Sequence, residues 1–221
     1  MVAPSTPPAV IAPMPTMPCP RCWATGHEGG DQTGYQCLLC LGRQVVDDEQ
    51  LAGHFWLSEV VRARSGYDQW PPVDALERLG ELARHLLEPV RLRFGRPLRV
   101  TSGYRCRSLD VVADRGNTYW LEHPSAHAIG AAADVCPLQL DAGSDLSHTL
   151  ARIMGIVRDT PGLEWDQAIL EGGCVHLALH APGPGRAQRR QLLLRCRAHE
   201  GPRPYRYEEW DGTEAQLTRC T

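Results

Sequence analysis

The residues that raise a chemical question first are His127 and Asp134, in the stretch SAHAIGAAADVCP at 125–137. The residues between them are small or apolar, which predicts that this stretch is buried. A buried carboxylate needs a partner, and a metal ion is one of the few partners that suits both an imidazole and a carboxylate. The pair therefore indicates a metal site whose other ligands come from elsewhere in the chain.

A third candidate ligand is His176, in the apolar segment CVHLAL. A lone histidine in such a segment is more often a packing residue, but its surroundings favour a ligand. The segment and the residues before it predict a β-hairpin that turns at Gly172 and Gly173. Such a hairpin pairs Ile169 with His176 and places Glu171 on the same face as His176. Two histidines and an aspartate leave a fourth position on zinc for water, and a nearby glutamate could take the proton from that water.

Four cysteines form two C-x2-C pairs, CPRC and CLLC, with a glycine-rich segment between them. Each pair can present two thiolates to one metal ion, and two pairs complete a tetrahedron. Because such a site leaves no coordination position open, its role would be structural or in partner binding. We therefore expect one structural zinc ion bound by Cys19, Cys22, Cys37 and Cys40.

The remaining histidines and cysteines have plainer interpretations. His123 and His180 are competing ligands, but His180 would lie about 13 Å from His176 along a strand, too far for one zinc ion. His27 could replace a cysteine of the finger, although four cysteines already suffice. We interpret the other cysteines as partly buried free thiols: Cys106, Cys136, Cys174, Cys196 and Cys220.

Length and composition limit the class of protein. The chain has 221 residues, 43% of them hydrophobic, and a formal net charge of −3, which predicts a folded domain of ordinary size with an appendage. The charge provides no general attraction to nucleic acid. No apolar run approaches the roughly 18 residues that a membrane span needs. The proline-rich N-terminal stretch does not have the features of a signal peptide, so we expect synthesis in a cytoplasm without a secretion signal.

Hydrophobic periodicity predicts helices and short strands without regular β-α-β alternation, which is typical of an α+β domain. A core-facing helix begins near Asp74, and Pro89 should kink or end it. We expect a short helix near Ser58 and a second long helix over 145–159. Residues 107–124 and the tail from 201 are polar and irregular in pattern. The expected strands are 97–102, 131–135, the two arms of the hairpin, and 191–196.

Three segments in order, SGYRC, SAHAIGAAADV and DQAILEGGCVHLAL, resemble the zinc D-alanyl-D-alanine carboxypeptidase family. Phage and bacterial members of that family carry an SGYR segment, an S-x-H-x-x-G-x-A-x-D segment and a late V-H strand. The likeness spans about residues 54–180, because HFWLSE and the helix before RPLRVTSGYR also fit the pattern. Separately, CPRCWATG and CLLCLG resemble half of the zinc-binding region of DnaJ-type chaperones, which implies no chaperone activity.

The resemblance implies a small α+β metallopeptidase domain around an antiparallel sheet, with the metal in an open cleft. It implies that His127, Asp134 and His176 bind a catalytic zinc ion and that a carboxylate near the last histidine is the general base. It also implies that Arg105 helps to hold the substrate carbonyl or carboxylate and that Ser125 lines the site.

The identity of the base is where this chain departs from many members, which place the acid where Gly173 stands here. Other members carry a DQ-x-I-x-E segment, and Asp166, Gln167 and Glu171 match that arrangement. We therefore predict Glu171 as the base with Asp166 in reserve, and we count Gln167 and Tyr104 among the substrate-binding residues.

Members of the family cleave bonds next to D-amino acids in peptidoglycan stem peptides. The resemblance thus predicts a phage-encoded zinc peptidase that acts on the bacterial cell wall, released at lysis or carried in a virion. The rival hypothesis is a virion or structural protein that uses the fold to bind wall peptides without cutting them. Under both hypotheses, the N-terminal arm and the zinc finger could dock to other virion proteins.

The expected organisation has four parts: a proline-rich arm (1–18), a four-cysteine zinc finger (19–46), a zinc peptidase domain (50–200) and a C-terminal tail (201–221). The expected cofactors are one catalytic and one structural zinc ion. A regulator that binds nucleic acid through the finger is disfavoured, because the finger holds one arginine, no lysine and two acidic residues. We expect neither nucleic acid nor a membrane as a partner.

Overall fold

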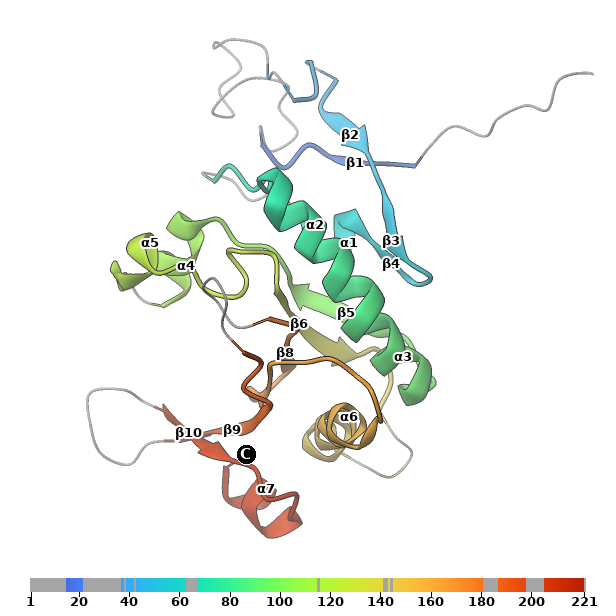
Figure 1. The fold of residues 1–221 in the computed structure, drawn as a ribbon, viewed down its shortest axis with the longest axis vertical. Coiled ribbons are helices and arrows are strands. Elements are labelled where there is room, and N and C mark those ends of the chain that lie inside the picture. The colour runs from blue at the N-terminus through green and yellow to red at the C-terminus, as the bar shows by residue number, and fades with distance from the viewer. Residues whose placement is uncertain are drawn as a thin grey trace, which may run out of the picture.

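Figure 1 shows the computed structural model of the chain. Cys22, His27 and the arm up to residue 14 fall outside the described residues. Within the described part, no helix has the length and apolar character required to cross a bilayer. The structure describes residues 15–21, 37, 39–41, 43–62, 67–114, 116–140, 143, 145–180, 187–197 and 205–220.

The centre of the molecule is a six-stranded mixed sheet with the strand order β10-β9-β7-β8-β6-β5. Its strands are β5 (Leu98–Ser102), β6 (Ala132–Pro137), β7 (Gln167–Leu170), β8 (Val175–Ala178), β9 (Gln191–Arg197) and β10 (Tyr205–Glu209). The α+β class is therefore confirmed.

The expectation of an antiparallel sheet needs one correction, because β7 and β9 run parallel. The other neighbouring pairs of this sheet are antiparallel. The end of β8 lies beside the start of β7, since Ala178 pairs with Gln167. The chain therefore returns to the start of β7, and β9 begins beside the same residue on the other side, where Gln191 pairs with Gln167. The parallel pair thus follows from the order of the strands and needs no helical crossover.

The first long helical segment runs through α2 (Val73–Leu82), η2 (Ala83–Leu87) and α3 (Glu88–Phe94), which continue one another (Figure 1). Pro89 does not end this helix. The chain instead adopts a π-helical turn, η2, directly before it. Proline lacks an N–H and its ring clashes with the carbonyl four residues earlier, so a change of hydrogen-bond spacing lets the helix continue.

The second long helix, α6 (Leu146–Asp159), is confirmed where the pattern predicts it. It begins after Asp145, whose Oδ1 accepts a hydrogen bond of 2.9 Å from the backbone N–H of His148. The helix packs against α3 and contacts β6, β7 and β8. Its buried side chains join those of the long helical segment and of the sheet in one core.

Alternation along the strands makes the two faces of the sheet different. Val135, Val175 and Leu177 are fully buried and belong to the core. Asp134 and His176, their neighbours along the strands, point to the opposite face. One face therefore stabilises the fold by apolar burial, and the other is free to carry polar groups.

Two regions that we expected to be irregular contain regular structure. Residues 107–124 include α4 (Arg107–Ala113) and α5 (Tyr119–Glu122), and the predicted tail forms β10 and α7 (Glu214–Cys220). A disulfide joins Cys196 on β9 to Cys220 on α7. The prediction of free thiols is therefore wrong for these two cysteines.

The N-terminal part is built from short pieces. Strand β1 (Thr16–Pro18) pairs with β2 (Val45–Asp47), and β3 (Gln50–Ala52) pairs with β4 (Phe55–Trp56), which leads into α1 (Leu57–Val60). The last residues of the predicted arm thus belong to a strand. The buried residues of these pieces are continuous with the core of the larger domain.

Two glycines provide a direct test of this fold. Gly130 has a φ of +76°, and a Cβ there would lie 2.2 Å from the carbonyl oxygen of Ala75. Gly130→Ala should therefore lower the free energy of unfolding by about 3 kcal/mol, measured by urea denaturation.

The matched control is Gly155→Ala in α6, where a Cβ would meet nothing within 4 Å. This change should raise the free energy of unfolding by about 0.5–1 kcal/mol, because alanine is the better helix former. Equal effects of the two substitutions would contradict the described conformation of Gly130.

Candidate metal centre

The three predicted metal ligands come together at one place on the open face of the sheet. Asp134 on β6 lies directly opposite His176 on β8, and Ile169 on β7 pairs with His176 from the other side. The predicted register of the hairpin is thus confirmed. His127 reaches the same place from the turn that precedes β6.

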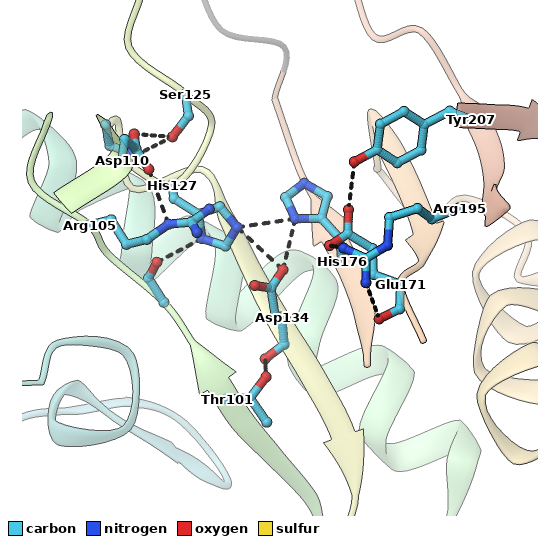
Figure 2. Close-up of polar contacts among 12 residues, drawn as sticks. Thr101, Arg105, Asp110, Ser125, His127, Asp134, Glu171, His176, Arg195 and Tyr207 are labelled. Atoms are coloured by element: carbon cyan, nitrogen blue, oxygen red, sulfur yellow. Dashed lines mark hydrogen bonds and ion pairs between the residues drawn. The ribbon is translucent and has the colours of Figure 1, made fainter. Parts of the chain in front are cut away.

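The ligating atoms of these residues form a tight triangle (Figure 2). His127 Nε2 lies 3.3 Å from Asp134 Oδ1, His176 Nδ1 lies 2.9 Å from the same oxygen, and the two nitrogens are 3.1 Å apart. Metal–ligand bonds of about 2.0–2.2 Å in a tetrahedron place ligand atoms roughly 3.3–3.6 Å from one another. The triangle is close to this size, so the group could hold a metal ion.

The hydrogen bond on the other nitrogen of His127 supports this interpretation. His127 Nδ1 lies 2.7 Å from the carbonyl oxygen of Gly103, so Nδ1 carries the ring proton and donates a hydrogen bond to this oxygen. The unprotonated His127 Nε2 then points its lone pair at a lone pair of the Asp134 carboxylate oxygen. His176 Nδ1 lies near both His127 Nε2 and Asp134 Oδ1, and a single proton on it can form a hydrogen bond with only one of them. A cation at the centre of the triangle would satisfy all three residues.

Burial and charge set the protonation states that metal binding requires. His127 is 2% exposed, and burial, assisted by the nearby charge of Arg105, lowers its pKa. Burial alone would raise the pKa of Asp134, but His127 and His176 outweigh it and lower the pKa of this carboxyl. Each shift by itself favours the form that coordinates metals, the neutral imidazole of His127 and the ionised carboxylate of Asp134.

Two glycines of the motif segments make this geometry possible. A Cβ on Gly103 would lie 2.2 Å from the carbonyl oxygen of Val60, to which the N–H of Tyr104 donates a hydrogen bond of 2.7 Å. The chain after β5 therefore passes close to α1 and brings the Gly103 carbonyl to His127. Gly130 closes the turn after His127 in a left-handed conformation.

The three predicted metal ligands lie in the wall of a cavity of about 740 Å³. Of the residues predicted to act on substrate, Arg105, Ser125, Gln167 and Glu171 also line this cavity. Tyr104 lines a separate small hollow beside α1, and burial raises its pKa to about 12. The structure thus brings together most of the predicted site but places Tyr104 outside it.

Asp166, the predicted reserve base, is fully buried and is not among the residues that line the cavity. The backbone N–H of Arg189 donates to its Oδ1 at 2.7 Å, and the Arg189 guanidinium pairs with both carboxylate oxygens. These contacts hold the segment that leads into β9. Asp166 is therefore placed to support the fold around the site and not to act on a substrate.

Arg105 and Ser125 are held by Asp110, a residue that the sequence analysis did not single out. Arg105 Nε lies 3.1 Å from Asp110 Oδ1, and the Ser125 hydroxyl donates to Oδ2 of the same carboxylate. Asp110 lies on α4, is 3% exposed and is one of the residues that line the cavity. The sequence feature that could have indicated Asp110 is a lone acidic residue between apolar neighbours, in a region that we interpreted as irregular.

Glu171 also has partners that were not predicted. Its Oε2 lies 3.3 Å from Arg195 Nη1, and the hydroxyl of Tyr207 donates to Oε1 at 3.1 Å. Figure 2 shows Glu171 beside His176 and between these two partners. Tyr207 belongs to the segment that we expected to be a structureless tail, so no sequence signal connected it with the site.

The cysteine at the hairpin turn does not offer an alternative nucleophile. Burial, with the charges of Asp134 and Glu171, raises the pKa of Cys174 to about 12. The thiol therefore stays protonated near neutral pH and is a weak nucleophile. The chemistry of this face rests on its histidines and carboxylates.

The competing histidines lie away from the triangle. His123 stacks on the ring of Tyr119, with centroids 4.0 Å apart, and His180 Nε2 lies 3.3 Å from Glu81. Neither belongs to a potential metal group within the described ranges. His127, Asp134 and His176 therefore form the group as predicted.

A second potential metal group consists of three of the four finger cysteines. Cys19, Cys37 and Cys40 are fully buried, and their sulfurs lie within 4.8 Å of one another, with Cys19 and Cys37 4.0 Å apart. Thiolates bound to one tetrahedral zinc ion at about 2.3 Å are roughly 3.8 Å apart. These three residues could hold a metal ion. Cys22, the predicted fourth ligand, falls outside the described part of the chain, so a complete finger stays a prediction.

Comparisons with protein-family models, with curated proteins and with solved structures find no match for this chain.

Metal binding at the triangle should be measurable without any substrate. After metal removal, zinc at about 100 times its dissociation constant should stabilise the protein by about 2.7 kcal/mol, or roughly 5–10 °C in Tm. Since the cysteine group can also bind zinc, the informative quantity is the part of the shift that His127→Ala removes. The control His148→Ala, at an exposed position in α6, should keep the full shift. An identical shift in all three proteins would contradict a metal centre at the triangle.

Proposed function

We propose that this chain is a zinc-dependent peptidase that cleaves peptidoglycan stem peptides next to D-amino acids. One observation carries the proposal. The ligating atoms of His127, Asp134 and His176 converge in the wall of a cavity that also contains Glu171 and Arg105. Two imidazoles and a carboxylate form a typical ligand set of catalytic zinc, with a fourth position left for water.

Each cavity residue has a role in such a reaction. A zinc ion held by the triangle would supply an activated water and polarise the scissile carbonyl. Glu171 takes the proton from the attacking water and returns it to the leaving amine. Arg105, oriented by Asp110, presents its charge to the carbonyl or the carboxylate of the substrate. The amide of Gln167 and the hydroxyl of Ser125 offer further hydrogen bonds.

The pairing of Glu171 with Arg195 and Tyr207 leaves it able to act as a base. An ionised carboxylate has about four lone-pair positions on its two oxygens. The described contacts use one position on each oxygen. The positions that remain can accept a proton from the cavity.

The substrate class follows from the resemblance of the three motif segments, and the cavity is consistent with it. A volume of about 740 Å³ can accommodate a short peptide. The guanidinium groups of Arg105, Arg189 and Arg195 in the cavity wall suit the carboxylates of stem peptides. We place the activity at the bacterial wall, after release at lysis or delivery in a virion. Cys19, Cys22, Cys37 and Cys40 would bind a second, structural zinc ion, available for docking to virion proteins.

The alternative is a virion or structural protein that binds wall peptides without cleaving them. One observation favours it, namely that Glu171, the predicted base, is engaged by an arginine and a tyrosine. The two functions differ in outcome when the protein meets a defined substrate.

The test of the proposal is incubation of the zinc-loaded chain with defined muropeptides, followed by mass spectrometry of the products. We expect new termini next to a D-amino acid, loss of cleavage with a chelator, and recovery on addition of zinc. Muropeptides that bind the zinc-loaded protein but remain intact would contradict the peptidase and support the wall-binding alternative.

Glu171→Gln tests the base. The substitution keeps the size of the side chain and one accepting oxygen but removes its basicity, so turnover should fall roughly 10²- to 10⁴-fold while zinc content and folding persist. Asp166→Asn should reduce turnover less, because Asp166 acts only through the segment that it holds. Near wild-type turnover in Glu171→Gln together with loss of activity in Asp166→Asn would move the role of base to Asp166.

A further inference from the structure

Glu171 lies at a position where the backbone does not by itself fix the orientation of the side chain. It is the last residue before the hairpin turn, and Gly172 and Gly173 follow it. Its N–H donates to the carbonyl of Cys174 at 2.9 Å, which fixes the backbone of the turn but not the carboxylate. A base must be held within a fraction of an ångström of its productive position, so the carboxylate needs anchors of its own.

Two side chains, Arg195 on β9 and Tyr207 on the edge strand β10, provide these anchors. Arg195 reaches Glu171 twice, with Nη1 at 3.3 Å from Oε2 and Nη2 donating to the backbone carbonyl at 3.2 Å. Tyr207 donates its hydroxyl to the other carboxylate oxygen at 3.1 Å. Each oxygen is thus held from a different strand, which defines both the position and the rotation of the carboxylate (Figure 2).

The register of the strands explains why these three residues meet. The parallel pairing of β7 and β9 matches Leu170 with Leu194, and one further residue along places Glu171 beside Arg195. The antiparallel pairing of β9 and β10 places Tyr207 directly opposite Arg195. The three side chains therefore form one row across adjacent chain segments.

The row is supported from outside. Tyr205 lies with its ring 5.3 Å from the guanidinium carbon of Arg195 and packs edge-to-face on Tyr207, with centroids 5.7 Å apart. Burial, with the charge of Glu171, raises the pKa of Tyr207, so its hydroxyl stays a donor near neutral pH. The disulfide between Cys196 and Cys220 follows directly after Arg195 and ties α7 to β9. The C-terminal segment 205–220 is thus attached at the anchors themselves.

We propose that Arg195 and Tyr207 are positioning residues that hold Glu171 in the orientation needed for proton transfer at the metal centre. The proposal rests on the proposed function, and it makes the C-terminal segment, which supplies Tyr207, a required part of the site. Neither anchor need touch the substrate. Their effect on turnover must therefore pass through Glu171.

A double-mutant cycle on the zinc-loaded full chain tests this dependence. Tyr207→Phe should lower kcat for muropeptide cleavage about 10-fold with little change in KM, because it removes an anchor and not a binding group. In the Glu171→Gln background, the same substitution should change kcat less than about twofold, because no base remains to be positioned. For Arg195, Arg195→Lys keeps the charge and one contact, so it should retain more activity than Arg195→Gln.

The matched control is Tyr205→Phe, which removes a hydroxyl from the same strand. The described residues include no hydrogen-bond partner for this hydroxyl, so its effect on kcat should be the same in the wild-type and the Glu171→Gln backgrounds. If the effects of Tyr207→Phe and Glu171→Gln simply multiply, Tyr207 does not act through Glu171 and the proposal is wrong.

A stability cycle separates this inference from the proposed function. The contact between Glu171 and Tyr207 should make the effects of Glu171→Gln and Tyr207→Phe on the unfolding equilibrium constant non-additive. The double variant should differ by about fivefold from the product of the two single effects, measured by denaturation. If the wild type cleaves no muropeptide, the peptidase proposal fails, and the anchor geometry is then judged by this coupling alone. Absence of coupling would overturn the positioning role whatever the activity of the wild type.

Discussion

The pairing of Asp134 with His176 across β6 and β8 is the constraint on which the rest of the site depends. Directly opposed residues of an antiparallel pair point to the same face, so one register brings a carboxylate and an imidazole together. A slip of one residue between the two strands would pair Asp134 with an apolar neighbour of His176, so one ligand would turn into the core while the other stayed on the polar face. The apolar burial that stabilises the sheet therefore also fixes the geometry of the candidate metal centre.

That constraint extends to residues that touch no metal. The Gly103 carbonyl can accept a hydrogen bond from His127 Nδ1 only because the chain after β5 passes close to α1. Asp110 orients Arg105 and Ser125 from α4, outside the sheet. The geometry of the cavity thus depends on contacts between elements that are distant in sequence.

The parts that could be predicted from the sequence have local signals. Alternating apolar residues and two glycines predicted the hairpin, and its register then followed from symmetry, which placed Glu171 and His176 on one face. The missed parts depend on contacts at long range. Nothing near Tyr207 shows that it meets Glu171, because β10 reaches the site only through pairing with β9. The π-helical turn before Pro89 and the Cys196–Cys220 disulfide likewise depend on packing that periodicity does not report.

The central claim is that His127, Asp134 and His176 bind one metal ion with a position left open. Anomalous X-ray diffraction from crystals of the zinc-loaded protein, collected on both sides of the zinc absorption edge, tests it most directly. We expect an anomalous peak within roughly 2.0–2.2 Å of His127 Nε2, His176 Nδ1 and an oxygen of Asp134, with a water in the fourth position. Crystals with zinc bound at the cysteine group but no anomalous density at the triangle would contradict it, as would a protein side chain in the fourth position.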